Sequence, residues 1–465
     1  LNQQSVSTDL PLGSTVLDFV RYHKRLAGTK IGCREGDCGA CTVLVGERED
    51  NQIVYRSMTS CLLPIGNVEG CHVVTIEGIN PPKGLSPVQE AMVEESATQC
   101  GFCTPGFVLS LTGYCLRGEK ADPSAAIAAL DGNICRCTGY KSIERAAARM
   151  AAKMYERGND HPVSFACKQG IVPAYFEQIV ERLNQLEAGQ PDPSLVQVER
   201  ATLVAGGTDL YVRRPEELSV SAIRRTHQLP NGRRIERAGD RCQIGPATTV
   251  QDLAESGLIQ QVLPGFDRYV KLVSSTPIRN MATIAGNFVN ASPIGDFSIF
   301  FLALDASLSI AQTDHPDQIT RILPLRKLYK GYKQLDLLPG ELIAGISFQL
   351  PKDGAKFNFE KVSKRTHLDI ASVNSAMRIR CEGSRIREAA LSAGGVAPVP
   401  LYLEATSNWL IGKTVEPSLP AQAMKIAEQE IKPIPDARGS RAYKQLLLGQ
   451  LLKAHWMTFF PDLDW

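Results

Sequence analysis

Thirteen cysteines occur in this chain of 465 residues, and the spacing of eight of them suits metal binding. The first group is Cys33, Cys38 and Cys41, with Cys61 following after 19 further residues. This C-x4-C-x2-C…C spacing is typical of a plant-type [2Fe–2S] cluster, in which three thiolates share one loop and a distant fourth completes the set. Structural zinc usually takes closely spaced cysteine pairs, so we favour a cluster over zinc or disulfides.

The glycines of the first cysteine loop support the same interpretation. Gly32, Gly36 and Gly39 stand beside the cysteines. A loop that turns around an inorganic core needs positive φ angles and backbone N–H groups directed at the sulfurs, and glycine permits both.

The second group of cysteines has a different pattern. Cys100 and Cys103 form a C-x2-C pair, and after 31 residues Cys135 and Cys137 form a C-x-C pair. On spacing alone, four sulfurs in two close pairs fit either a second cluster or a zinc ion. The presence of the first group favours a cluster at the second group as well. Two neighbouring clusters would conduct electrons, whereas a zinc ion beside the first cluster would have no evident role. We expect the other five cysteines to be ordinary thiols: Cys71, Cys115, Cys167, Cys242 and Cys381.

Three short segments further along favour a flavin site. Leu203–Leu210 reads as a strand that enters a glycine turn, and successive backbone N–H groups in such a turn can bind phosphate. The segment lacks G-x-G-x-x-G, which disfavours a Rossmann fold. Thr283–Asn287 and Ser292–Asp296 add small residues for close backbone approach and polar groups for phosphate and ribityl oxygens. The alternative for these two segments is a plain glycine-bearing strand and a Pro-Gly turn.

Length and composition limit the possible functions. The chain is long enough for about three domains, and its net charge of +2 gives no reason to expect nucleic acid or a membrane surface as a partner. It has no apolar run long enough for a membrane span and no visible signal peptide. It does not begin with Met, so residues could precede Leu1. Cysteines in ligand spacing predict a reducing, cytoplasmic location.

The pattern along the chain predicts the following domains: a ferredoxin-like domain over 1–80, a helical domain over 81–156, a linker over 157–172, a flavin domain over 173–350 and a C-terminal domain over 351–465. The linker is expected to be exposed, and Gly189–Pro193 extends its loop-like composition beyond one amphipathic helix at about 173–188.

Local signals predict individual elements. A helix starts at Val16 after Ser14, and β-branched runs predict strands at 42–45 and 73–76. Ser86 and Gln89 form a capping box, and further helices are expected over 105–116 and 141–156. Because each cysteine pair of the second group precedes a helix, we expect the two clusters to lie close together.

The cysteine motifs resemble those of the xanthine dehydrogenase/aldehyde oxidase family of molybdenum hydroxylases. The matching segments are EGDCGACTV (35–43), QCGFCTPG (99–106) and NICRCTGY (133–140), and the likeness continues to near the C-terminus. The resemblance implies an α+β multidomain chain with a β-grasp ferredoxin-like domain, a four-helix [2Fe–2S] domain, an α/β FAD-binding domain of non-Rossmann type and a C-terminal α+β flavoprotein domain.

The same resemblance implies the cofactor contacts. The eight cysteines of the two groups would ligate two [2Fe–2S] clusters. The residues implied to contact FAD are Leu203, Val204, Ala205, Gly206, Gly207, Thr208, Asp209, Leu210, Thr283, Ile284, Gly286, Asn287, Ser292, Asp296 and Lys361. Asp369 and Tyr332 would lie near the flavin or the nicotinamide. For Lys361, Asp369 and Tyr332 the alternative is a solvated surface residue. The chain has Val273 where relatives often place Phe beside the flavin, which removes a stacking contact.

The function implied is electron transfer from a molybdenum site through the helical-domain cluster, the plant-type cluster and FAD to NAD, in the oxidation of xanthine or hypoxanthine. No side chain is expected to act as an acid or base. The molybdenum cofactor would lie on a large partner subunit, which Gln99 would face, and the assembly would be an α2β2 heterotetramer. Two alternatives stay open: an aldehyde or N-heterocycle hydroxylase, and a stand-alone NADH–acceptor reductase.

Overall fold

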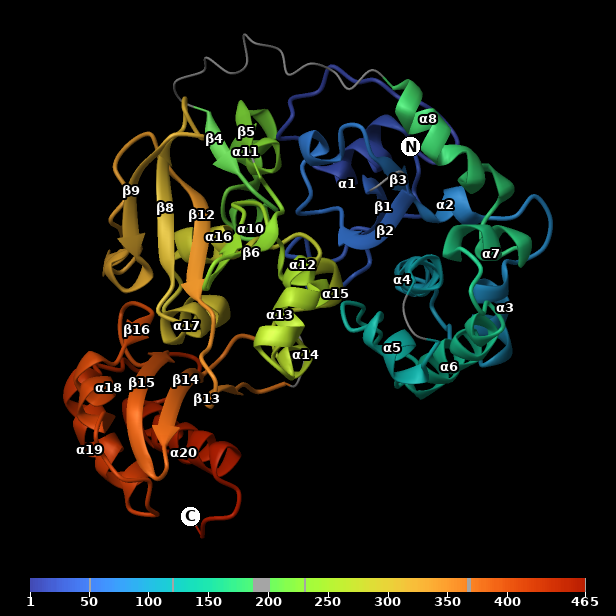
Figure 1. Cartoon of the computed structure of the whole chain (residues 1–465). Helices are drawn as coiled ribbons and strands as arrows, with labels where there is room; N and C mark the ends of the chain where they lie inside the picture. Colours follow the sequence, from blue (N-terminus) through green and yellow to red (C-terminus); the bar gives the residue numbers. More distant parts are fainter. Residues whose placement is uncertain (50–51, 119–120, 187–200, 230, 366–368, 465) are drawn as a thin grey trace. The chain divides into compact units, whose positions relative to one another are not determined.

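The computed structural model of the protein describes residues 1–49, 52–118, 121–186, 201–229, 231–365 and 369–464. The chain divides into two compact units (Figure 1). The first unit comprises Leu1–Arg225 and Ser275–Met281, and the second comprises Thr226–Ser274 and Ala282–Trp465. The multidomain α+β fold predicted from the sequence is confirmed.

A small antiparallel sheet in the order β2-β1-β3 begins the first unit. Its strands are β1 (Thr42–Glu49), β2 (Gln52–Thr59) and β3 (His72–Val74). The strand predicted over 42–45 lies within β1, whereas the one predicted over 73–76 ends at Val74, because Thr75 is the N-cap of a short helix that begins at Ile76. The first helix begins at Val16 as expected, with Thr15 rather than Ser14 as its N-cap, because the Thr15 hydroxyl accepts a hydrogen bond from the Asp18 N–H. This first helix is α1 (Val16–Asp18). The other short helices beside the sheet are η1 (Phe19–His23), η2 (Ile65–Val68) and α2 (Ile76–Ile79).

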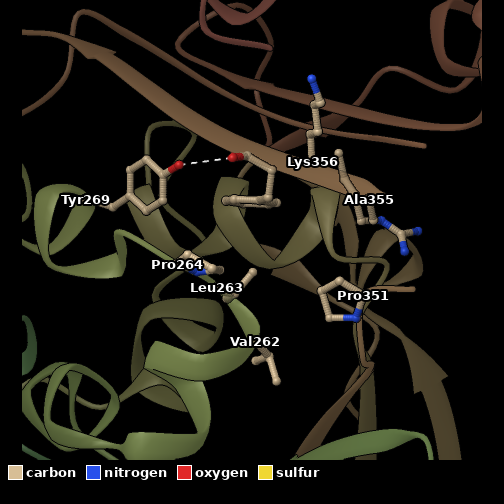
Figure 2. A pocket seen from close by; sticks show the side chains of 9 residues that line it. Val262, Leu263, Pro264, Tyr269, Pro351, Ala355 and Lys356 are labelled. Atoms are coloured by element: carbon tan, nitrogen blue, oxygen red, sulfur yellow. Dashed lines mark hydrogen bonds between the residues drawn. The ribbon is translucent and has the colours of Figure 1, made fainter. Parts of the chain in front are cut away.

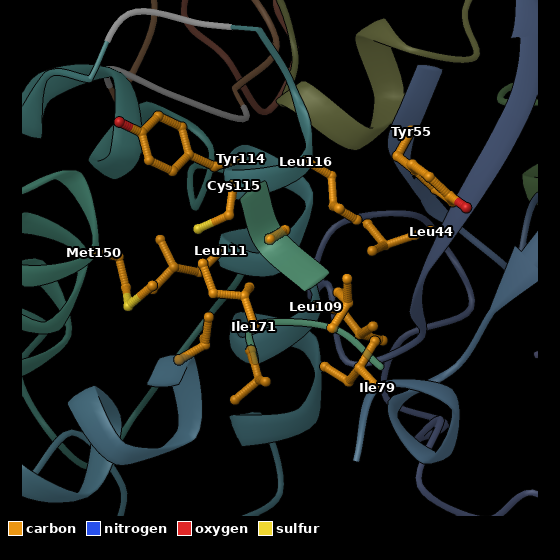
Figure 3. Packing of buried hydrophobic residues seen from close by; sticks show 14 of the residues in the cluster. Leu44, Tyr55, Ile79, Leu109, Leu111, Tyr114, Cys115, Leu116, Met150 and Ile171 are labelled. Carbon is orange, nitrogen blue, oxygen red and sulfur yellow. The ribbon is translucent and has the colours of Figure 1, made fainter. Parts of the chain in front are cut away.

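The helical part of the first unit packs directly on this sheet. Its helices are α3 (Pro87–Glu94), α4 (Thr104–Leu116), α5 (Pro123–Ala128) and α6 (Lys141–Tyr155). The predicted capping box is present at α3. Every residue of α4 from Gly106 to Leu116 is buried, and Figure 3 shows α4 side chains between Leu44 and Tyr55 of the sheet and Met150 of α6. One hydrophobic core therefore supports both predicted cluster domains.

The structure differs from the sequence prediction over residues 157–172. Instead of an exposed linker, this stretch contains α7 (Pro162–Lys168) and buries Val163, Phe165 and Ile171 in the core of the helical part. Apolar residues at helical spacing outweigh the Gly, Asn and Asp at its start. The expected helix at 173–188 is η3 (Ala174–Gln178) followed by α8 (Ile179–Gln185). Gly189–Pro193 lies outside the described residues.

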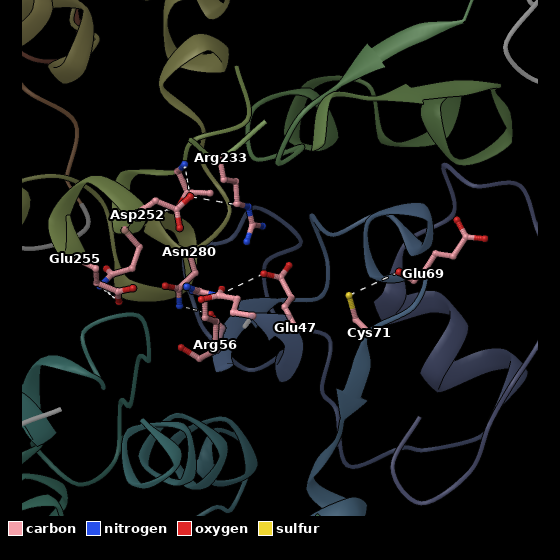
Figure 4. A network of polar contacts seen from close by, with 12 residues as sticks. Glu47, Arg56, Glu69, Cys71, Arg233, Asp252, Glu255 and Asn280 are labelled. Atoms are coloured by element: carbon pink, nitrogen blue, oxygen red, sulfur yellow. Dashed lines mark hydrogen bonds and ion pairs between the residues drawn. The ribbon is translucent and has the colours of Figure 1, made fainter. Parts of the chain in front are cut away.

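A polar cluster beside the sheet further stabilises the first unit (Figure 4). The Arg56 side chain on β2 is 4% exposed and donates to Glu49 at 2.6 Å and Glu47 at 3.4 Å. Asn280 donates to the Ser57 carbonyl at 2.7 Å. Ser275–Met281 is thereby joined to the sheet, although it is far away in sequence. The last elements of this unit are a parallel pair and three short helices: β4 (Thr202–Val204), β5 (Ile223–Arg225), α10 (Leu210–Arg213), α11 (Pro215–Val220) and α15 (Thr276–Arg279).

Two antiparallel sheets organise the second unit. The first has the order β6-β7-β12-β8-β9, and the second has the order β13-β14-β15-β16. The strands of the first sheet are β6 (Ile235–Ala238), β7 (Arg241–Ile244), β8 (Ser307–Gln312), β9 (Ile319–Pro324) and β12 (Glu341–Gln349). A small hairpin joins β10 (Tyr329–Gly331) to β11 (Gln334–Leu335). The strands of the second sheet are β13 (Ala355–Val362), β14 (Val373–Glu382), β15 (Arg385–Gly394) and β16 (Leu401–Tyr402).

Helices cover these sheets. The apolar helix α17 (Asp296–Ala303) contacts β14 and β15 and therefore belongs to the shared core of the second unit. The helices are η4 (Thr226–Gln228), α12 (Val250–Glu255), α13 (Gly257–Val262), α14 (Phe266–Val270), α16 (Ile284–Asn290), α17 (Asp296–Ala303), η5 (Leu325–Lys327), α18 (Glu404–Leu410), α19 (Leu419–Glu430) and α20 (Arg441–Phe459). In the described part of the chain, none of the helices combines the length and apolarity needed to cross a bilayer.

A buried histidine is expected to make the second unit sensitive to acid. His455 on α20 is fully buried and bonds to Asn358 at 3.0 Å and Ser375 at 3.1 Å. Burial lowers its pKa to about 3, so the unfolded chain, with a pKa of about 6.5, binds the proton more tightly. We expect the unit to lose about 1.4 kcal/mol of stability per pH unit as pH falls from about 6.5 toward 3.

Tryptophan fluorescence during urea unfolding measures this effect, since all three tryptophans lie at or after residue 409. His455→Gln should flatten the pH dependence, whereas His315→Gln, at an exposed position, should not. An unchanged slope in His455→Gln would assign the acid sensitivity to another group.

Candidate functional site

The first four predicted ligands form two sulfur pairs at one end of the small sheet. Cys41 precedes β1 and Cys61 follows β2, and the pairing of Thr42 with Thr59 places these two cysteines at the same end. The Cys41 thiol lies beside that of Cys61, and the Cys33 thiol beside that of Cys38, close enough for each pair to shift its partner's pKa. The contact with Cys38 lowers the pKa of Cys33 to about 5, while the pKa of Cys38 is raised by the same contact. Metal binding to each pair would release protons.

The loop geometry fits an inorganic cluster. Gly36 and Gly39 have φ angles of +80° and +67°, as the loop interpretation requires. A Cβ atom on Gly32 would lie 2.6 Å from the Cys38 sulfur, so only glycine leaves that sulfur room. The Glu35 N–H donates to the Cys33 sulfur at 3.3 Å, a contact that would tune the potential of a bound cluster.

The second group of sulfurs is also arranged as two pairs. Cys137 lies 3.6 Å from Cys100, sulfur to sulfur, and Cys135 lies beside Cys103, close enough to raise its pKa. The Cys135 sulfur also accepts from the Thr138 hydroxyl at 3.2 Å. Cys103 caps α4, and the other pair precedes α6, which confirms the expected placement of each pair before a helix.

The pairs also bear on the zinc alternative. Two separate pairs in each group match the two irons of a [2Fe–2S] cluster, which need two thiolates each. The assignment of all eight ligands stays a prediction.

Replacing Cys135 by serine tests that assignment. Because its sulfur is the buried member of the second group, we expect this variant to lose the second cluster and about half of the bound iron while keeping the first cluster. Iron analysis and electron paramagnetic resonance of the reduced protein measure both. Cys115→Ser, at a buried thiol outside both groups, is the control. Full iron content in Cys135→Ser would remove Cys135 from the ligand set.

The loops that carry the two groups are in direct contact. The Ile134 N–H, one residue before Cys135, donates to the Cys38 carbonyl at 3.0 Å. The Asn133 amide donates to the Gly39 carbonyl at 3.1 Å and accepts from Ser110 at 2.7 Å. A main-chain hydrogen bond therefore joins the loops that carry the two cysteine groups, while the proximity of the clusters themselves stays a prediction. Asn133 was not predicted as a functional residue, although it lies only two positions before Cys135.

The predicted phosphate-binding turn packs against the first cysteine group. Gly207 has a φ of +78°, and a Cβ atom there would lie 2.7 Å from the carbonyl oxygen of Leu62, the residue after Cys61. The Ala205 carbonyl accepts from Asn67 at 2.7 Å. Val204 is buried, and Asp209 pairs with Arg213 at the surface. All these contacts lie within the first unit.

The other predicted flavin residues lie in the second unit. Thr283 caps α16 by accepting from the Gly286 N–H at 3.1 Å. The Asn287 amide oxygen accepts from the Ser298 N–H at 3.0 Å, so it caps α17. Ile284 is fully buried and donates its N–H to the Thr248 carbonyl. Of these residues, Asn287 lies beside the Ser292–Asp296 turn, and the contact of all of them with FAD stays a prediction.

Lys361 is not a surface residue. Its side chain is 2% exposed, and its ammonium donates to Asp296 at 2.8 Å and to the Leu272 carbonyl at 2.7 Å. By contrast, Tyr332 is 63% exposed at the β10–β11 turn, and Asp369 accepts from the Arg365 N–H at 2.7 Å. Val273 is half-buried against the core of the second unit.

Asn374 on β14 is a further polar residue here that the sequence analysis missed. It donates to Asp296 at 2.6 Å. No motif identifies it, because its partner lies 78 residues away in sequence.

A separate small pocket opens elsewhere in the second unit (Figure 2). Leu263, Pro264 and Pro351 line it, and the Tyr269 hydroxyl donates to the Phe357 carbonyl at 3.0 Å beside it. None of the predicted cofactor residues lines this pocket.

Comparison with known protein families covers most of the chain. Four family models match in order: a 2Fe-2S iron-sulfur cluster binding domain over 1–65, a [2Fe-2S] binding domain over 75–148, an FAD binding domain in molybdopterin dehydrogenase over 171–352, and a CO dehydrogenase flavoprotein C-terminal domain over 359–459. This is the iron–sulfur/FAD arrangement of the xanthine dehydrogenase and CO dehydrogenase family of molybdenum hydroxylases. The paired sulfurs and the glycine turns described above agree with the iron–sulfur and FAD-binding domains of this arrangement.

Individual relatives agree with the family. Xanthine dehydrogenase 1 of Arabidopsis thaliana is 28% identical over 91% of this chain, and the xanthine dehydrogenase of Blastobotrys adeninivorans is 27% identical over 88% of it. The chain spans 36% of the length of each. Among solved structures, a CO dehydrogenase from Oligotropha carboxidovorans is 25% identical, with a TM-score of 0.51 over 55% of this chain and 87% of that one. Quinoline 2-oxidoreductase from Pseudomonas putida, 19% identical with a TM-score of 0.52 over 59% of this chain and 94% of that one, shares the fold.

Proposed function

We propose that this chain carries electrons from a molybdenum site on a large partner subunit to NAD during oxidation of xanthine or hypoxanthine. When bound, two [2Fe–2S] clusters would carry single electrons, and FAD would pair them for hydride transfer to NAD. The eight predicted cysteines would hold the clusters. The segments Leu203–Leu210, Thr283–Asn287 and Ser292–Asp296, with Lys361, would hold FAD.

The observation that carries this proposal is the continuous contact between the sites of the first unit. Ile134 joins the second cysteine group to Cys38, and Leu62, beside Cys61, contacts the Gly207 turn. Contact between these loops would shorten electron transfer between the two clusters and from the first cluster toward the Gly207 turn. A stand-alone reductase would not need the second cluster site.

The surface near the second cysteine group supports a partner. Cys100 and Cys137 are exposed, and Phe102 is 48% exposed beside them. Gln99 donates to the Cys137 carbonyl at 3.1 Å. We propose that Gln99 and this surface face the molybdopterin-binding subunit, in an α2β2 heterotetramer located in the cytoplasm.

Anaerobic visible spectra of the natively purified complex test the proposed function. Xanthine should bleach the flavin and cluster bands, and NAD should restore them. Bleaching by carbon monoxide, quinoline or an aldehyde instead would assign another substrate of the same family. Purification without a larger molybdenum-containing chain, together with reduction by NADH alone, would favour the stand-alone reductase.

The boundaries predicted after residues 80 and 350 also stay a proposal, whereas 157–172 and the start of the predicted flavin domain, up to Ile179, pack in the core of the helical part. Limited proteolysis with mass spectrometry of the fragments would locate them.

A further inference from the structure

The Ser292–Asp296 turn is held by strands of the C-terminal sheet. The Gly395 N–H, directly after β15, donates to the Pro293 carbonyl at 2.9 Å. The Asn374 amide on β14 donates to the Ile294 carbonyl at 3.2 Å and to one Asp296 oxygen at 2.6 Å. Residues about 80 to 100 positions later in the sequence thus fix this turn.

Both oxygens of the Asp296 carboxylate are engaged. Asn374 donates to Oδ1, and Lys361 donates to Oδ2 at 2.8 Å. The Asp296 side chain is 13% exposed, the Lys361 side chain is 2% exposed and Asn374 is fully buried. Charge-assisted bonds from two directions, in a site that water hardly reaches, hold the carboxylate in one orientation.

The contacts of Asn374 require its amide nitrogen, and not its amide oxygen, to face the turn. Its amide nitrogen faces two acceptors, so a flipped amide would direct an oxygen at a carboxylate and at a carbonyl. Its amide oxygen is buried without a hydrogen-bond partner, which costs stability. A Cβ atom on Gly394, the residue that pairs with Asn374 across the sheet, would collide with that oxygen.

Lys361 connects the same carboxylate to a second turn. Its ammonium also donates to the Leu272 carbonyl at 2.7 Å. Leu272 precedes Val273, which the family resemblance places beside the flavin, and Ser274, whose φ is +43°. One buried ammonium thus connects Asp296 with a backbone segment in the left-handed region, where a non-glycine residue needs support.

We propose that Asn374 and Lys361 are positioning residues for FAD, and that the C-terminal sheet sets the orientation in which Asp296 meets the cofactor. The proposal rests on the proposed flavin site. A carboxylate that is already held by two donors can accept a hydrogen bond from a hydroxyl of the ribityl chain without first being ordered. FAD binding therefore costs less free energy for ordering the site.

Titration of FAD into the deflavinated full chain, followed by quenching of flavin fluorescence, tests this inference. Asn374→Leu and Asp296→Asn should each weaken FAD binding about tenfold, as loss of a charge-assisted bond predicts. The double variant should bind no more weakly than the weaker single variant, because Asn374 acts through Asp296. Asn358→Leu removes another fully buried amide of the same sheet and should leave FAD affinity within about twofold.

Asn374→Asp provides a second test that preserves side-chain shape. Its carboxyl can donate to Asp296 only when protonated, so FAD should bind more weakly at pH 8 than at pH 5, with a larger difference than in the wild type. Additive losses in the double variant, or unchanged affinity in Asn374→Leu, would overturn the inference. Failure of the wild-type chain to bind FAD would instead overturn the proposed flavin site itself.

Discussion

Replacing Gly39 by alanine is expected to remove both clusters at once. Gly39 has a φ of +67°, and its Cβ atom would lie 2.9 Å from Asn133 Cα and even closer to the Gly132 carbonyl. Gly106 also packs against the Gly39 backbone, because a Cβ atom on Gly106 would collide with the Gly39 carbonyl oxygen. The new methyl group must therefore push apart the two loops that carry the cysteines.

The expected loss of unfolding free energy is about 2–4 kcal/mol, from overpacking together with an unfavourable φ. Iron content, and the paramagnetic resonance signals of the reduced clusters, should fall for both sites. Gly70→Ala is the matched control: its φ is +73°, but its Cβ would meet nothing within 4 Å. That variant should keep both clusters. Loss of only the first cluster in Gly39→Ala would show that the two loops move independently.

Replacing Asp131 by alanine is expected to destabilise the first unit by about 3–5 kcal/mol, as removal of one partner of a buried ion pair does. Arg279 on α15 donates to Asp131 at 2.8 Å, and the two side chains are 7% and 8% exposed. Asp131 also accepts from the Thr276 N–H at 2.7 Å. This carboxylate therefore anchors Ser275–Met281 to the helical part of the unit.

Urea unfolding, followed by the visible absorbance of the clusters, measures this loss. Glu144→Ala, which breaks an exposed pair with Lys141, should cost less than about 1 kcal/mol. Asp131→Leu combined with Arg279→Met should recover much of the loss, because no unpaired charge then stays buried. A cost below about 1 kcal/mol for Asp131→Ala would mean that Arg279 finds another partner.

Local chemistry explains what the sequence predicted well. The capping box at Ser86 and the apolar face of α6 depend on residues within a few turns of one another, and the cysteine motifs are recognised from their short local spacings, so all of them are readable along the chain. The glycine loops are similar, because a positive φ is a property of one residue. The order of the cluster and flavin domains follows from these local signals.

Long-range contacts explain what the sequence did not predict. The helix in the expected linker forms because Val163, Phe165 and Ile171 find a core to pack on. Lys361 becomes buried only because Asp296, 65 residues earlier, supplies a carboxylate that repays the cost of removing the ammonium from water. Asn133 and Asn374 gain their roles from partners 94 and 78 residues away. The sequence by itself determined which groups could hold the cofactors, and only the tertiary structure decided which buried side chains fix those groups in place, because burial and partner geometry depend on the packing of distant segments.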